Sequence, residues 1–360
     1  MRAKTFLLMA GGTGGHVYPA LATARMLQQR GDRVAWMGSK NGMEESVVVA
    51  TGIPFNGLSV SGLRGKGAIT LLLAPFKLLV ALWQALVIIK KVKPDCVLGM
   101  GGFASGPGGL AAKLMGKPLI IHEQNAIAGM TNRLLSKLAT SVMGAFPNAF
   151  PEGIDVKLTG NPLRDGICNI YYRAKPELAA DRKIKVLVLG GSLGAAKLNE
   201  CIPEALALLD CSIRPEVWHQ TGANKLDTTL ASYQRLGMSA KVNAYIDDME
   251  DAYSWADFVI CRAGALTISE LCVAGLGAIL VPYPFAVDDH QTLNARSMET
   301  AGAAWLVHQE QLNPDMLAEI LRPLLEKRER ITTLANAAHK LGKPEATEQV
   351  VAECRRVCYA

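Results

Sequence analysis

Short runs of apolar residues alternate with segments of helical periodicity along the chain. In the first half, residues 19–27 repeat at helical spacing, and strands are predicted at residues 5–10, 33–37, 96–100 and 119–125. The strands predicted in the second half span residues 184–189, 215–219, 257–261 and 278–282, with helices between them and a helical stretch over 314–358. This alternation predicts the α/β class, with doubly wound parallel sheets covered on both faces.

Each half opens with a glycine-rich turn directly after its first predicted strand. The two turns have the sequences GGTGGH at residues 11–16 and GGSLGA at residues 190–195. Such a turn brings backbone N–H groups and a helix N-terminus close to an anion above it. We therefore expect two similar Rossmann-like domains that face a cleft in which the chemistry takes place.

The length of 360 residues exceeds what a single core usually supports. The turn-type sequence GNPLR at residues 160–164 marks the expected boundary. We expect an N-terminal domain over residues 1–163 and a C-terminal domain over residues 164–340. Residues 341–360 are expected to form a helix that packs back on the N-terminal domain.

The amino-acid composition indicates which kinds of molecule the protein binds. A net charge of +6 and a pI of about 8.8 favour phosphates, nucleotides or an acidic lipid surface. Aromatic residues make up only 6% and do not interleave with basic runs, which argues against nucleic-acid binding. The eight cysteines form no C-x-x-C pair, so a zinc site is not expected. We expect the cysteines to be the reduced thiols of a cytosolic protein. The apolar N-terminal stretch is too short for a signal peptide.

Residues 68–89 form an unusually apolar segment. Its polar or helix-breaking interruptions are Thr70, Pro75, Lys77 and Gln84. Cations flank it on both sides, namely Arg64, Lys66, Lys90, Lys91 and Lys93. Three interpretations stay open: a helix of the core, a helix whose exposed part touches the bilayer surface, and a true transmembrane span.

The glycine turns do not match the common cofactor fingerprints. A dinucleotide site needs G-x-G-x-x-G, but Val17 stands at its third glycine, and Gly38 and Ser39 replace the ribose-binding acid. The P-loop sequence is absent, and so is the Asp-x-Asp pair that holds a metal–diphosphate in many sugar transferases. A diphosphate would then be held by a helix N-terminus, with no metal.

Residues 257–270 are the strongest candidate for such a helix N-terminus. The predicted strand ends at Cys261, Gly264 allows a turn, and a helix begins near Ala265. The amides of Leu266 and Thr267 lie in its first turn, and Glu270 could bind ribose hydroxyls. Alternatively, Glu270 is simply an acid that favours the start of any helix.

Three further polar groups are candidates for chemistry. His16 closes the first glycine turn and could accept a proton as a neutral imidazole, or it could be structural. The sequence HEQN at residues 122–125 ends a predicted strand, where polar groups usually face a ligand, although Asn125 could instead cap a helix. The sequence DDHQ at residues 288–291 fits a helix start better than a metal chelate.

Taken together, these motifs resemble one bacterial family. The motifs, in chain order, are GGTGGH at 11–16, GGFASGP at 101–107, HEQN at 122–125, GNP at 160–162, GGS at 190–192, RAGALTISE at 262–270 and DHQ at 289–291. The chain thereby resembles, over nearly its whole length, the UDP-N-acetylglucosamine:N-acetylmuramyl-(pentapeptide) pyrophosphoryl-undecaprenol N-acetylglucosaminyltransferases. The resemblance implies a GT-B fold, an inverting transfer that turns lipid I into lipid II without a cofactor, and a peripheral position on the cytoplasmic face of the plasma membrane. It also allows cell-wall and division proteins as partners.

The resemblance also implies roles for individual residues. In the C-terminal half, UDP-N-acetylglucosamine is expected at Ser192 (diphosphate), Ile246 (uracil), Gln291 (sugar hydroxyls) and the helix start formed by Ala265, Leu266, Thr267, Ile268, Ser269 and Glu270. In the N-terminal half, the sugar is expected near Thr13, Gly14, Gly15 and Asn125, with Arg164 at the domain junction and the acceptor diphosphate over the glycine turns. Leu193 departs from the family, where glutamine is common.

The expected mechanism is a single displacement, with His16 as the favoured base and Glu123 as the runner-up. The lipid-linked acceptor favours bilayer contact for the apolar segment, through Phe76, Leu79 and Trp83. Two other functions stay open: a UDP-N-acetylglucosamine 2-epimerase, which shares the fold and donor, and a nucleotide-sensing scaffold at the membrane.

Overall fold

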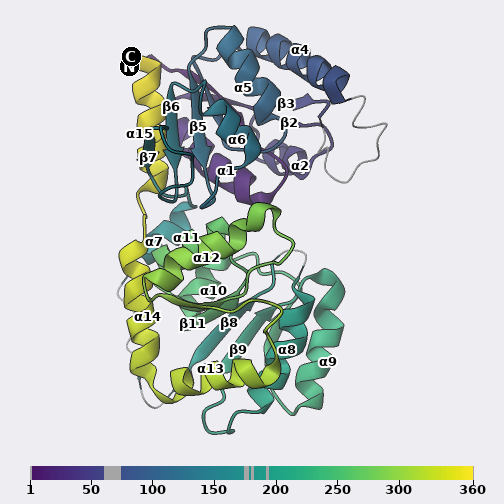
Figure 1. Ribbon diagram of the computed structural model, residues 1–360, viewed down its shortest axis with the longest axis vertical. Coiled ribbons are helices and arrows are strands. Elements are labelled where there is room, and N and C mark those ends of the chain that lie inside the picture. Colours follow the sequence, from purple (N-terminus) through teal and green to yellow (C-terminus); the bar gives the residue numbers. More distant parts are fainter. Residues whose placement is uncertain (1, 61–73, 174–177, 180–181, 192–193, 360) are drawn as a thin grey trace. The chain divides into compact units, whose positions relative to one another are not determined.

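A computed structural model describes residues 2–60, 74–173, 178–179, 182–191 and 194–359. The chain divides into two compact units. Unit 1 comprises Met1–Arg164 and Glu345–Ala360, and unit 2 comprises Asp165–Pro344. Each unit holds one parallel β-sheet with helices against it (Figure 1). The expectation of two doubly wound α/β domains is therefore confirmed.

Unit 1 is built on a seven-stranded sheet in the order β3-β2-β1-β4-β5-β6-β7. The strands are β1 (Thr5–Met9), β2 (Arg33–Ser39), β3 (Phe55–Leu58), β4 (Cys96–Gly99), β5 (Leu119–Glu123), β6 (Ser141–Gly144) and β7 (Val156–Leu158). The helices are α1 (Gly14–Gln29), α2 (Met43–Val49), α4 (Ala74–Val92), α5 (Ser105–Leu114), α6 (Met130–Leu135) and α15 (Ala346–Tyr359). Phe6 lies opposite both Val34 of β2 and Cys96 of β4, which places β1 in the centre of the sheet.

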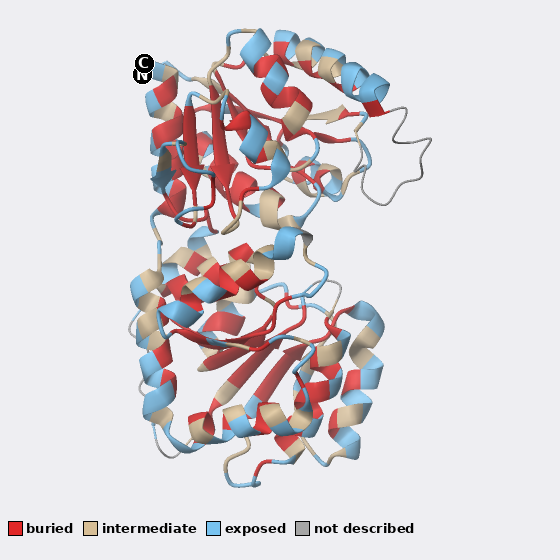
Figure 2. Cartoon of the chain, in the orientation of Figure 1, coloured by how far each residue is buried: buried red, intermediate tan, exposed pale blue. Residues whose placement is uncertain are grey.

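Side chains of β1 alternate between two apolar cores, one on each face of the sheet. Phe6 and Leu8 pack with α1 and α15, whereas Leu7 and Met9 pack with α4 and α5. The central strands are buried on both faces, as the buried colouring in Figure 2 shows. Burial on both faces explains why these strands appear in the sequence as continuous apolar runs.

Unit 2 has a six-stranded sheet in the order β10-β9-β8-β11-β12-β13. The strands are β8 (Lys185–Leu189), β9 (Glu216–Gln220), β10 (Lys241–Asn243), β11 (Phe258–Cys261), β12 (Gly277–Leu280) and β13 (Ala304–Leu306). The helices are α7 (Asp165–Ile170), α8 (Ala196–Ala207), η1 (Ala223–Lys225), α9 (Leu226–Arg235), α10 (Met249–Trp255), α11 (Ala265–Ala274), η2 (Val287–Asp289), α12 (His290–Thr300), α13 (Pro314–Glu326) and α14 (Arg328–Leu341). Every strand pair in this sheet is parallel, so the carboxyl ends of all six strands lie along one edge.

The C-terminal helix α15 belongs to unit 1, where it packs against α1 and β4. Glu353 fastens it to the sheet: its carboxylate accepts hydrogen bonds from Ser141 of β6 at 2.6 Å and from Lys157 of β7 at 2.8 Å. The side chain of Arg356 also donates to Glu353. These donors hold the pKa of the Glu353 carboxyl at about 2, with the Arg356 hydrogen bonds as the largest cause.

Candidate active site

The first glycine turn joins β1 to the start of α1. Gly12 adopts a positive φ of 88°, and the backbone of Gly102 packs so closely on Gly11 that a Cβ at position 102 would lie 2.4 Å from the Gly11 carbonyl oxygen. The glycine loops after β1 and β4 are therefore in backbone contact, which only glycine permits. This contact fixes the start of α1, where Thr13, Gly14 and Gly15 lie.

A buried carboxylate, Glu44 of α2, lies behind this turn. Its side chain accepts hydrogen bonds from the amides of Gly12 at 3.2 Å and Ser39 at 2.8 Å. The Gly12 amide is therefore already engaged, and an anion above the turn would be received by the first-turn amides of Gly14 and Gly15. Thr13, the N-cap of α1, makes no side-chain capping bond to these amides. Sequence reasoning missed Glu44, because nothing in the local pattern indicates its contact with the turn.

His16 lies in the first turn of α1 and is bound to the end of β5. Its Nδ1 is 2.7 Å from Oε1 of Gln124. The imidazole also lies against Gly101, where an added Cβ would come within 2.8 Å of the ring. Gly101 has a φ of +98°, so its lack of a side chain serves both the backbone conformation and the position of the ring.

Glu123 is 1% exposed and its two oxygens are occupied. Oε1 accepts from the amides of Gln124 and Asn125 and from Nδ2 of Asn125, at 3.0–3.1 Å. Oε2 accepts from the amide of Gly129 at 3.2 Å and from Nδ2 of Asn132 at 2.8 Å. A buried carboxylate with five donors holds the surrounding backbone in place, and both of its oxygens are already engaged. These contacts argue against Glu123 as the catalytic base, so His16 is the better candidate for that role.

The predicted diphosphate-binding helix is α11, which begins directly after β11 and a short turn. Its N-cap is Gly264, which has no side chain to cap the first-turn amides, so the amides of Leu266 and Thr267 point out of the helix end. A helix N-terminus carries about half a positive charge, which favours an anion at this position. Ile268 donates its amide to the Gly264 carbonyl and thus already belongs to the regular helix.

Two polar side chains lie near this helix start. Glu270 of α11 accepts a hydrogen bond from the hydroxyl of Tyr253 at 2.9 Å, so a tyrosine on α10 orients the carboxylate assigned to the ribose. Ser269 donates its hydroxyl to the Ala265 carbonyl at 3.1 Å. The sequence analysis did not identify Tyr253 as a site residue, because no recognisable motif links it to Glu270.

The remaining predicted donor contacts are only partly defined. Gln291 accepts the amide of Tyr283 on Oε1 at 2.9 Å, and its Nε2 forms no hydrogen bond with the described residues. Ile246 donates its amide to Oε1 of Gln220 at 3.0 Å. Its carbonyl is therefore the backbone group that could bind the predicted uracil. Arg164 is exposed at the end of unit 1, and Ser192 and Leu193 lie outside the described residues.

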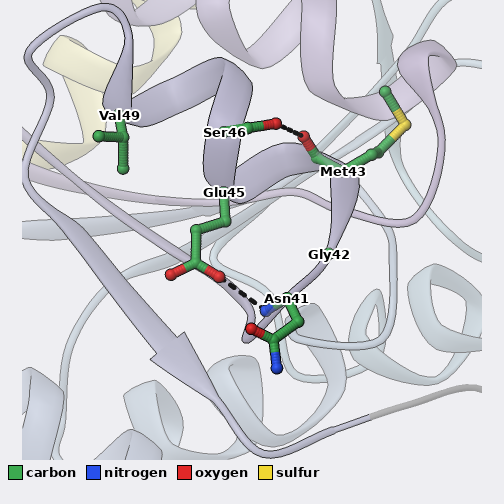
Figure 3. A pocket seen from close by; sticks show the side chains of 6 residues that line it. All are labelled: Asn41, Gly42, Met43, Glu45, Ser46 and Val49. Atoms are coloured by element: carbon green, nitrogen blue, oxygen red, sulfur yellow. Dashed lines mark hydrogen bonds between the residues drawn. The ribbon is translucent and has the colours of Figure 1, made fainter.

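An open hollow of about 600 Å³ lies elsewhere, at the turn between β2 and α2. Its lining residues are Asn41, Gly42, Met43, Glu45, Ser46 and Val49 (Figure 3). They all come from one turn and one short helix, and their polar groups bond to each other: Asn41 donates its amide to Glu45, and Ser46 donates to the Met43 carbonyl. None of the predicted site residues lines this hollow.

Helix α4 exposes large apolar side chains. Its buried positions are the small or aliphatic residues Ala74, Ala81, Ala85 and Ile89. Phe76, Leu79 and Trp83 are 68%, 62% and 65% exposed. Of the three interpretations of the apolar segment, a helix lying wholly in the core is excluded by this exposure; Arg64, Lys66 and residues 68–73 lie outside the described part. No helix in the described ranges is long and apolar enough to cross a bilayer.

Family models that match most of the chain identify it as a glycosyltransferase. Residues 6–144 match the glycosyltransferase family 28 N-terminal domain, and residues 185–350 match the glycosyltransferase family 28 C-terminal domain. A crystal structure of Acinetobacter baumannii MurG is similar with a TM-score of 0.84 and 40% identity, covering 98% of this chain and 99% of that one. The protein is therefore a hexosyltransferase with the two-domain architecture of this family.

Its curated relatives narrow the family further. The chain is 54% identical over 98% of its length to a UDP-N-acetylglucosamine–N-acetylmuramyl-(pentapeptide) pyrophosphoryl-undecaprenol N-acetylglucosamine transferase of Marinobacter nauticus, of which it covers 97%. The chain belongs to this transferase family. A UDP-N-acetylglucosamine 2-epimerase has a TM-score of 0.64 but only 12% identity, so it shares the fold alone.

Proposed function

We propose that the enzyme carries out its N-acetylglucosaminyl transfer as a single displacement. The C4 hydroxyl of undecaprenyl-pyrophosphoryl-N-acetylmuramyl-pentapeptide attacks C1 of the sugar of UDP-N-acetylglucosamine, and UDP leaves from the opposite face. This is the conversion of lipid I to lipid II in cell-wall synthesis. The near full-length identity to transferases of that name supports the substrates, and the contacts of His16 and α11 support the route.

UDP-N-acetylglucosamine is held by unit 2 in this proposal. The first-turn amides of α11 receive the diphosphate, and the dipole of that helix stabilises the charge that develops as UDP leaves. Glu270, oriented by Tyr253, binds the ribose hydroxyls. Nε2 of Gln291 donates to the sugar, and the Ile246 carbonyl accepts from the uracil. No metal ion or cofactor takes part.

His16 takes the proton of the acceptor hydroxyl. Its ring is held by Gln124 and Gly101, and positioning of this kind is a large part of what a base contributes. The acceptor diphosphate lies at the amides of Gly14 and Gly15, since Glu44 occupies that of Gly12. Asn125 lines the sugar site, and Arg164 contributes from the end of unit 1.

Helix α4 brings the enzyme to its lipid-linked acceptor. Phe76, Leu79 and Trp83 enter the interface of an anionic membrane at its cytoplasmic face, and Lys90 and Lys91 in the last turn of the helix bind the headgroups. The protein is then peripheral to the membrane, where it can also contact cell-wall and division proteins.

A transfer assay tests the proposed function directly. Labelled UDP-N-acetylglucosamine is incubated with the protein and a short-chain lipid I analogue, with and without EDTA. We expect transfer with inverted configuration, at an unchanged rate in EDTA. Incubation with the donor alone is the control, because an epimerase would convert the donor sugar without an acceptor. Transfer that EDTA abolishes and only magnesium restores would contradict the metal-free route.

A further inference from the structure

Beyond the proposed base, a continuous chain of hydrogen bonds runs from His16 into the core of unit 1. Gln124 and His122 are both fully buried. The Gln124 amide group lies between the two histidines, with Oε1 2.7 Å from Nδ1 of His16 and Nε2 2.9 Å from Nδ1 of His122. On its far side, Nε2 of His122 lies 3.0 Å from the Gly160 carbonyl oxygen.

Two backbone carbonyl oxygens near His122, its own and that of Gly160, fix the directions of the hydrogen bonds. Nε2 of Gln124 lies 3.0 Å from the His122 carbonyl oxygen, which can only accept, so the NH₂ group of Gln124 must face His122. The second N–H of that group then donates to Nδ1 of His122. Nε2 of His122 also lies 3.2 Å from Oγ1 of Thr159, but that hydroxyl donates its proton to the Gly160 carbonyl at 3.0 Å. Nε2 therefore carries the proton of His122 and donates it to the Gly160 carbonyl. Burial lowers the pKa of His122 to about 4, which agrees with a neutral ring.

The same reasoning determines which ring nitrogen of His16 carries the proton. With its NH₂ group turned toward His122, Gln124 presents its carbonyl oxygen to His16, and Nδ1 of His16 must be the donor. In the neutral ring, the lone pair is then on Nε2, and no described residue forms a hydrogen bond with that nitrogen.

We propose that Gln124 is a positioning residue that holds His16 in the Nδ1–H tautomer, so that Nε2 is the nitrogen that accepts the substrate proton. His122 is the buried anchor that fixes the orientation of the Gln124 amide. The catalytic consequence rests on the proposed function of His16 as the base, whereas the tautomer itself does not. Which nitrogen of a histidine carries the proton is set by the bond that the other nitrogen makes.

Nitrogen-15 NMR of the unmodified protein tests the tautomer directly. The two ring nitrogens of a neutral imidazole differ strongly in chemical shift according to which one is protonated. The chain has six histidines, and the spectrum of His16→Ala assigns the signal of interest. We expect His16 as the Nδ1–H form and His122 as the Nε2–H form in the same spectrum. A neutral His16 that carries its proton on Nε2 overturns the proposal.

A double-mutant cycle tests the route from Gln124 to catalysis. Gln124→Met keeps the length of the side chain but replaces the carbonyl acceptor of His16 by a thioether sulfur, which accepts only weakly. We expect kcat to fall about tenfold, since one hydrogen bond biases an equilibrium by up to roughly that factor, while KM for the donor changes less than twofold. In the His16→Ala background, the same substitution should change kcat less than twofold, because Gln124 acts only through His16.

Thr23→Val is the matched control for loss of a buried hydrogen bond. Thr23 lies on the same helix as His16, is fully buried, and donates to the Pro19 carbonyl at 2.9 Å. We expect this variant to lose thermal stability with an unchanged kcat. Equal losses from Gln124→Met with and without His16 overturn the positioning role. If His16→Ala itself has little effect while the NMR shows the Nδ1–H form, the proposed base fails and the tautomer assignment stands.

Discussion

Replacing Ala265 by proline removes one backbone donor from the proposed diphosphate site without removing the helix. Proline is accepted at the first position of a helix, where its fixed φ fits and its missing N–H is not part of the helical ladder. The preceding residue must be extended, and Gly264 already is, with φ −63° and ψ 142°. Helix α13 of this chain shows the same arrangement naturally, with Pro314 after an extended Asn313.

The size of the effect follows from the charge of the ligand. A hydrogen bond to a charged group contributes about 1.5–3 kcal/mol, which corresponds to roughly a 10- to 150-fold change in Kd. Uridine has no phosphate, so its affinity should be unaffected by the substitution. We therefore expect Ala265→Pro to bind UDP at least about tenfold more weakly and to bind uridine as before.

Isothermal titration calorimetry with UDP and with uridine measures both values. Met130→Pro at the start of α6 is a control for the backbone change, because Gly129 has nearly the same angles, φ −60° and ψ 152°. Ala265 is only 6% exposed, so the thermal stability of Ala265→Pro is measured as well. Met130 is 72% exposed, so proline is accommodated there, and UDP binding should not change. If Ala265→Pro keeps its thermal stability and its UDP affinity falls less than threefold, the Ala265 amide does not hold the diphosphate.

Three further predictions concern the base, the membrane and the C-terminal helix. His16→Ala should lower kcat by about 10²-fold or more, as general-base catalysis is worth 10²–10⁴, with KM for the donor little changed; a loss below tenfold assigns the proton to another group. Leu79→Glu combined with Trp83→Glu should release the protein from anionic liposomes in flotation while keeping activity on a short-chain acceptor, and unchanged flotation contradicts the membrane role of α4. The depressed pKa of Glu353, about 2, contributes stability that is present above the unfolded pKa near 4.3 and lost as the pH falls toward 2. The difference in Tm between the wild type and Glu353→Gln should thus shrink over that interval, and a constant difference would show that the charge of Glu353 is not responsible.

The apolar pattern of the sequence predicted the inner strands with one exception and missed the edge strands. The exception is β6, which is buried but only four residues long and begins with a polar residue, Ser141. Strands β1, β4, β8 and β11 are buried on both faces, so each is a continuous apolar run. The outermost strands β3, β7, β10 and β13 were not found. They are three or four residues long and partly exposed, so they carry neither a long apolar run nor a clear alternation.

The apolar segment that became α4 shows a second limit of pattern reasoning. Its periodicity predicts a helix in every environment, but it does not say which face is covered. The structure buries alanines such as Ala81 and Ala85 and exposes Phe76 and Trp83. The face of α4 that packs against α5 and β3 therefore carries mostly small side chains, and the large ones lie on the exposed face. Only the packing partners of a helix decide this, and they lie far away in the sequence.

The sequence indicated which positions form the candidate site, but not which role each residue has in it. Glycine turns and polar strand ends have local signatures, so His16 and the HEQN sequence were recognised. The sequence could not distinguish which polar group was free to act. Glu123 and His16 were both plausible bases until the contacts showed that Glu123 accepts five hydrogen bonds, from the loop that follows it and from Asn132 of α6.

Contacts between distant segments supply what local patterns lack. Gln124 reaches His16 across 108 positions, and Glu44 reaches Gly12 across 32. Each of these side chains decides which groups of the glycine turn remain available: Glu44 consumes one amide, and Gln124 assigns the proton of the imidazole. A glutamine beside a histidine in sequence carries no such information, because the amide acquires a direction only from the carbonyl oxygen that its NH₂ group must face. In the proposed mechanism, buried groups behind the glycine turn thus determine which nitrogen of His16 can accept a proton.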